Sequence, residues 1–150
     1  MSYELRIERQ FDATPEVVFD TFVDPDTQEE LHGSDQEGWT VHRSETDISV
    51  GGTSTIVMGP EGKEPDTETR VYSVVDRPHR LVFRYAMKVA ELGRTIDTEI
   101  TITFEDRDGG TWFTMVETGF EREEDRDGFT EGWAEYLETL GRILKARHDT

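Results

Sequence analysis

The sequence predicts an α+β protein in which a curved antiparallel sheet of six to seven strands wraps around one long C-terminal helix, with two short helices after the first strand. Two patterns predict it. Apolar residues recur at helical spacing from Phe129 to Arg147, whereas most of the preceding chain alternates at strand spacing. A single helix needs an apolar surface to cover, and a bent sheet supplies one while leaving space between them. Because 150 residues make about one domain, we expect residues 1–150 to form one unit.

The composition narrows the range of partners. The chain has 34 acidic and 16 basic residues, a formal net charge of −18, which repels nucleic acid phosphates and anionic membrane surfaces. We therefore expect neither nucleic acid binding nor membrane insertion. The carboxylates are spread along the whole chain, so we interpret them as a hydrated surface rather than a recognition surface. Such a balance would suit a salt-rich cytoplasm or a high-GC genome.

Motifs for common cofactors and catalytic templates are missing from the sequence. The chain has no cysteine, which excludes disulfides, thiol nucleophiles and thiolate metal sites, and no glycine-rich phosphate or dinucleotide motif. Residues Met1–Phe11 lack an apolar signal core, so we expect a cytoplasmic protein. We expect no cofactor and no metal, since the four histidines lack metal-ligand spacing: His32, His42, His79 and His148.

The N-terminal third predicts a strand and two short helices. Apolar and charged residues alternate over Tyr3–Ile7, as in a strand with one wet face. Thr14 is a good helix cap and Pro15 fits a first helical turn, so a helix begins there and ends at Asp24. A second short helix is expected over Thr27–His32.

The middle of the chain predicts a run of antiparallel strands. Glycine pairs, Pro78 and the Asp108-Gly109-Gly110 turn separate them, and residues 59–65 form a polar loop. The expected strands are Trp39–Asp47, Thr53–Met58, Thr67–Asp76, Arg80–Met87, Asp97–Glu105 and Thr111–Thr118.

The last predicted element is the amphipathic helix Phe129–Arg147. The acidic segment Glu121–Asp127 is expected to precede its N-terminus, where carboxylates interact favourably with the helix dipole. Gly132 and Gly141 each cost about 1 kcal/mol relative to alanine in a helix, and a close approach to the sheet would explain them. The apolar face comprises Phe129, Trp133, Tyr136, Leu137, Leu140, Ile143 and Leu144.

Several local stretches, in order along almost the whole chain, carry a family resemblance. They are Ala13–Phe19 with Asp24-Pro25, Gly51-Gly52 with Met58-Gly59-Pro60, Val75–Val82, Ile102–Glu105, Thr118–Phe120 and Gly132-Trp133. These stretches resemble bacterial proteins grouped with the C-terminal domain of the activator of Hsp90 ATPase (AHSA1-like). That group lies in the START-like, Bet v 1-like (SRPBCC) superfamily, so the resemblance implies a helix-grip domain over residues 1–150.

The resemblance implies several functions rather than one. Relatives bind hydrophobic ligands of the lipid or polyketide type, assist chaperones, confer resistance by binding a toxic compound, or cyclise polyketides. Many members carry tryptophan just after the second helix begins, where this chain has Glu30-Leu31-His32 and reaches tryptophan only at Trp39. Fold alone does not fix function, so a relative's ligand does not transfer.

The predicted site is the space between the inner sheet face and the last helix. Glu117 is in phase with Phe113 and Met115, so its carboxylate should point inward and must find a partner, raise its pKa or face water in a cavity. Most of the other candidate residues are of types found more often in a simple core. The candidate lining is His32, Trp39, Met58, Phe83, Tyr85, Met87, Ile102, Phe113, Met115, Glu117, Trp133, Tyr136, Leu137 and Leu140.

Three functional hypotheses follow. The first is binding of a small hydrophobic or aromatic molecule in this cavity, with apolar burial supplying most of the binding energy. The second is a cyclase- or aromatase-like enzyme that uses Glu117 or His32 for acid–base steps. The third is a chaperone partner resembling the Hsp90 activator. We expect binding rather than catalysis, assign no catalytic residue, and consider a homodimer compatible with a protein of this size.

Overall fold

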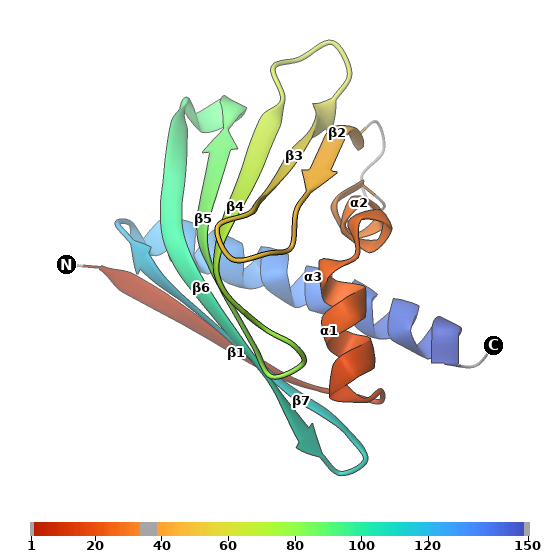
Figure 1. The fold of residues 1–150 in the computed structure, drawn as a ribbon. Coiled ribbons are helices and arrows are strands. Elements are labelled where there is room, and N and C mark those ends of the chain that lie inside the picture. The colour runs from red at the N-terminus through yellow and green to blue at the C-terminus, as the bar shows by residue number, and fades with distance from the viewer. Residues whose placement is uncertain (1, 34–38, 149–150) are drawn as a thin grey trace.

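The computed structural model describes residues 2–33 and 39–148, apart from the side chains of Glu29, His32, Trp39 and His148. Its elements follow the expected order of one strand, two short helices, six further strands and a long helix (Figure 1). In order they are β1 (Tyr3–Phe11), α1 (Pro15–Val23), α2 (Pro25–Gly33), β2 (Trp39–Thr46), β3 (Thr53–Pro60), β4 (Asp66–Asp76), β5 (Arg80–Val89), the 3₁₀ turn η1 (Ala90–Leu92), β6 (Arg94–Arg107), β7 (Gly110–Phe120) and α3 (Glu123–His148).

The seven strands form one antiparallel sheet. Their order is β1-β7-β6-β5-β4-β3-β2, so strands β2 to β7 follow one another as a meander. Strand β1 pairs with β7 and forms one edge of the sheet. Figure 1 shows the sheet curving while α3 runs across it, with α1 and α2 near the C-terminal half of that helix. The predicted fold class is confirmed, with seven strands. No helix in the described ranges is long and apolar enough to cross a membrane.

The two short helices meet at a polar cap. Thr14 accepts a hydrogen bond from the Val17 amide (3.4 Å), as predicted for the start of α1. The carboxylate of Asp24 then accepts from both the amide (3.1 Å) and the hydroxyl (2.9 Å) of Thr27. Asp24 therefore caps a helix that starts at Pro25, so the predicted start at Thr27 was two residues late.

The long helix starts six residues before the predicted position. Glu123, Glu124 and Asp125 form its first turn rather than a segment preceding it. Asp125 accepts two hydrogen bonds of 2.8 Å from the guanidinium of Arg94, a residue three positions before the expected start of β6. This ion pair lowers the pKa of Asp125, mainly through the hydrogen bonds, and fixes the helix start on the sheet. Apolar periodicity could not show it, because the first turn has no apolar face.

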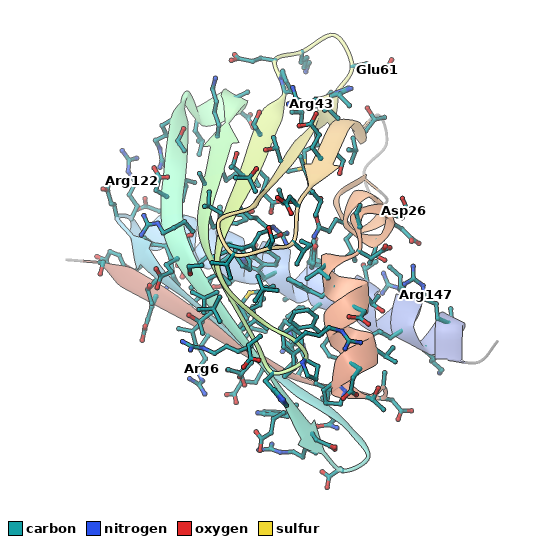
Figure 2. The ribbon with its side chains drawn as sticks, viewed as in Figure 1. Arg6, Asp26, Arg43, Glu61, Arg122 and Arg147 are labelled. Atoms are coloured by element: carbon teal, nitrogen blue, oxygen red, sulfur yellow. The ribbon has the colours of Figure 1, made fainter. Side chains whose placement is uncertain are left out.

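Strand alternation places the expected residues in the core. Ile100, Ile102 and Phe104 on β6 and Phe113 and Met115 on β7 are all buried in the core between the sheet and the helices. By contrast, Figure 2 shows charged side chains at the periphery of the molecule, and those labelled there include Arg6, Arg43, Glu61 and Arg122.

The two helix glycines differ from each other. A Cβ at Gly141 would lie 3.5 Å from the Phe11 ring, so the expected close approach to the sheet is confirmed there. A Cβ at Gly132 would have no heavy atom within 4 Å, so that expectation was wrong for Gly132. The space beside Gly132 belongs to a cavity.

We predict that Asp125→Asn lowers the free energy of unfolding by about 1–2 kcal/mol, because it removes one partner of a partly buried, doubly hydrogen-bonded ion pair. Chemical denaturation measures the change, and amide hydrogen exchange should show faster opening of the first turn of α3. Glu124→Gln, an exposed change in the same turn, is the matched control. Equal effects of the two variants would contradict the anchoring role of Asp125.

Candidate ligand-binding cavity

A cavity of about 310 Å³ lies between strands β3 to β5 and the N-terminal half of α3. The strands contribute inward side chains, and α3 contributes one face spaced at about one helical turn. Most of the lining is apolar or aromatic. The lining residues are Met58, Asp66, Tyr85, Met87, Val89, Gly128, Phe129, Gly132, Trp133 and Tyr136.

Aromatic rings form one wall of the cavity. The Tyr85 ring packs perpendicular to Phe129 (centroids 6.0 Å apart) and lies 5.9 Å from Trp133. Trp133 in turn packs edge-on against Tyr136 at 4.9 Å. Such edge-to-face contacts hold rings in defined orientations, so the wall has a fixed shape.

The opposite boundary, on α3, includes backbone. Gly128 and Gly132 lie one turn apart, both are exposed, and a Cβ at either position would have nothing within 4 Å. Because both glycines also line the cavity, they mark where it opens to solvent.

Glu117 fixes the orientation of the cavity tryptophan. Its carboxylate accepts a 2.8 Å hydrogen bond from the indole N–H of Trp133 and a 2.6 Å hydrogen bond from the hydroxyl of Thr98. Burial raises the pKa of Glu117 to about 7, although both hydrogen bonds oppose the rise. Glu117 thus points inward as expected from the sequence. Its carboxylate has hydrogen-bond partners, and its pKa is raised.

A pair of buried charges also lies beside the cavity, and it was not predicted from the sequence. Glu68 and Arg70 on β4 are almost fully buried, and Nη2 of Arg70 donates to Oε1 of Glu68 at 3.1 Å. The guanidinium lies over three rings, with its Cζ atom 5.6, 5.2 and 6.0 Å from the ring centroids of Phe22, Phe83 and Trp133 respectively. Burial alone would lower the pKa of Arg70, but the charge of Glu68 raises it above its ordinary value.

One signal in the sequence could have revealed this pair. Glu68 and Arg70 share strand phase with Tyr72, a large aromatic residue that is 1% exposed, whereas Val71, between Arg70 and Tyr72, is 40% exposed. These two charged residues of β4 therefore face the core, whereas in a simple amphipathic strand the charged residues face solvent.

Tyrosine hydroxyls surround the buried pair. Burial raises the pKa of Tyr85 well above its ordinary value, and it raises the pKa of Tyr136 to about 12 against the influence of Arg70. Both phenols therefore keep their protons at neutral pH. Near Tyr72, the Ser54 hydroxyl donates to the side-chain oxygen of Gln28 at 3.3 Å.

The structure divides the predicted site residues into three groups. Five line the cavity: Met58, Tyr85, Met87, Trp133 and Tyr136. Seven are buried but are not among the lining residues: Phe83, Ile102, Phe113, Met115, Glu117, Leu137 and Leu140. The side chains of two lie outside the described residues: His32 and Trp39.

Five lining residues were not predicted: Asp66, Val89, Gly128, Phe129 and Gly132. Alternation indicates which face of a strand is inward but not how far along the strand the packing stops. Over the described ranges, no cluster of three or more His, Cys, Asp or Glu residues could hold a metal ion.

A curved antiparallel sheet, a long C-terminal helix across it and an apolar cavity between them define a protein of the helix-grip class. The family described as "Activator of Hsp90 ATPase homolog 1-like protein" matches residues 12–145. The chain belongs to this family, and the resemblance seen in its sequence is confirmed.

Solved structures from several organisms share the fold. An uncharacterised protein from Rhizobium leguminosarum has a TM-score of 0.84 at 22% identity, over 97% of this chain and 96% of its own. A protein from Chromobacterium violaceum has a TM-score of 0.79 at 21% identity, over 94% and 96%. An AHSA1-like protein from Aeromonas hydrophila has a TM-score of 0.75 at 23% identity, over 97% and 94%. No curated protein matched the chain. These likenesses establish the fold alone.

We predict that Glu117 makes the protein less stable as pH rises. Below about pH 4.5 both folded and unfolded states hold the proton, whereas above about pH 7 the folded state carries the full cost of a buried charge. The free energy of unfolding of Glu117→Gln relative to the wild type should therefore increase by about 3 kcal/mol between these limits. Denaturation at both pH values measures this difference.

The exposed Glu99→Gln on β6 is the control, and it should differ from the wild type by less than about 0.5 kcal/mol at either pH. A glutamine at position 117 can still accept a hydrogen bond from Trp133, so the variant should fold. A constant difference between Glu117→Gln and the wild type over this pH range would contradict the prediction.

Proposed function

We propose that the protein binds a small hydrophobic or aromatic molecule in the cavity between the sheet and α3. The observation that supports this proposal is the cavity of about 310 Å³ with its mostly apolar and aromatic lining. Small-molecule sites are typically concave, largely apolar, and about 300–1,000 Å³ in volume, with a few polar groups.

The size of the cavity limits the ligand. An apolar protein cavity of about 150 Å³ accepts benzene, so this one has room for roughly two such rings. A ligand that buries about 250 Å² of apolar surface would gain about 6 kcal/mol before the cost of association is subtracted. We therefore expect a compact guest bound with modest affinity.

The cavity wall favours a guest with flat faces. Tyr85, Phe129 and Trp133 present rings whose orientations are set by their mutual contacts. The hydrogen bond from Trp133 to Glu117 adds a polar constraint on the indole. A preformed wall of this kind lowers the entropy lost on binding.

The two alternative functions have less support. For acid–base catalysis, both oxygens of Glu117 are already bonded to Thr98 and Trp133, and Glu117 does not line the cavity. Chaperone association rests on the family description and on no contact within the fold, and it stays a hypothesis.

Native mass spectrometry of protein purified from its own source tests the proposal directly. A co-purifying small organic molecule that is released on denaturation is the expected result. Titration with the neutral two-ring fluorescent probe 1-naphthylamine gives an independent test, because the emission of this probe shifts to shorter wavelength in an apolar site. If no molecule co-purifies and the probe does not bind, the proposal is wrong.

We predict that Gly132→Leu weakens binding of this probe at least about tenfold, because the new side chain fills the open part of the cavity. The fold should be retained, since a Cβ at this position meets no atom within 4 Å and leucine favours helix over glycine by roughly 1 kcal/mol. Glu131→Leu adds the same side chain at the neighbouring exposed position and should leave binding unchanged. Equal affinities of both variants would place the probe elsewhere.

A further inference from the structure

We propose that the ligand carries an uncharged oxygen acceptor, such as a ketone carbonyl, and that this oxygen accepts hydrogen bonds from the guanidinium of Arg70. The inference rests on the proposed function and adds the chemistry of the ligand's polar end.

Arg70 has donors without acceptors in a fully buried place. Its side chain is 0% exposed, and one of its nitrogens, Nη2, donates to Glu68. Its Nε and Nη1 atoms have no hydrogen-bond partner among the side chains and backbone that the structure describes. Guanidinium stays protonated, so these N–H groups remain donors at every physiological pH. A buried donor without a partner is costly, and a ligand acceptor would remove that cost.

Arg70 is not itself one of the lining residues, but its guanidinium lies next to residues that are. Arg70 pairs with Tyr85 in the β4–β5 register, and its Cζ atom lies 6.0 Å from the centroid of the Trp133 ring. Tyr85 and Trp133 both line the cavity, as does Tyr136, whose hydroxyl is influenced by the charge of Arg70. A flat molecule lying along these rings would therefore bring one end toward Arg70.

Charge balance favours a neutral acceptor over a carboxylate. The charge of Arg70 is already balanced by Glu68, and two further carboxyl groups, Glu117 and Asp66, lie nearby. An anionic ligand would add a buried negative charge with no unpaired cation among the described side chains to meet it. A carbonyl oxygen can accept two N–H bonds and adds no charge.

Three probes that share one ring system separate these possibilities in the wild-type protein: 2-ethylnaphthalene, 2-acetylnaphthalene and 2-naphthoate. Dissociation constants come from protein NMR titrations. We expect the ketone to bind at least about tenfold more tightly than the hydrocarbon, although the hydrocarbon is the more hydrophobic. We also expect it to bind more tightly than the carboxylate. Addition of the ketone should shift the Nε–H resonance of Arg70, and the hydrocarbon should not.

The double variant Glu68→Gln/Arg70→Met provides the matched control, because it removes the donors without leaving a lone buried charge. It should keep the wild-type affinity for 2-ethylnaphthalene and lose the preference for the ketone. Should this variant fail to fold, the Arg70 resonance in the wild type still decides the question.

The outcomes separate the two proposals. Equal binding of ketone and hydrocarbon, or an unshifted Arg70 resonance, would overturn the role of Arg70 and leave the cavity proposal standing. Tightest binding of 2-naphthoate would overturn the choice of a neutral acceptor. If none of the three probes binds, the cavity proposal fails and this inference fails with it.

Discussion

The hydrogen bond from the Trp133 indole to the Glu117 carboxylate joins the long helix to the floor of the sheet at the edge of the cavity. Farther along α3, apolar packing fixes the helix by burying Leu137, Leu140 and Leu144 in the core. A polar contact of 2.8 Å instead sets the helix position at one point and leaves the neighbouring volume open. Thr98 completes the arrangement by bonding the second carboxylate oxygen. The cavity thus depends on a carboxylate that is itself expensive to bury.

The core contains more charge than stability requires. Glu68, Arg70 and Glu117 occupy inner-face positions at which apolar residues of similar volume would be at least as stable. Their shared location, beside the aromatic wall, gives this cost a common explanation. The three groups lie behind the mostly apolar lining rather than in it, and strand register and ring contacts keep them in place.

Periodicity in the sequence predicts most of the fold and only part of the site. Alternation correctly predicts that Phe83, Tyr85 and Glu117 face inward. Thr14 and Pro15 correctly predict the start of the first helix. The start of α3 was missed because its first turn is held by an ion pair to Arg94, which lies about 30 residues earlier in the chain. The lining was only half predicted because a cavity is the place where packing stops, and that depends on distances between elements rather than on any local pattern.

The exposed glycines of α3 also bear on how a guest would reach the interior. At Gly128 and Gly132 the rim of the cavity is helix backbone, with no side chain to rotate aside. Helical backbone is stiff compared with a loop, so this side of the aperture is nearly fixed in position. Discrimination at the rim would then act on the cross-section of a molecule, as in a sieve, before any polar group inside is met.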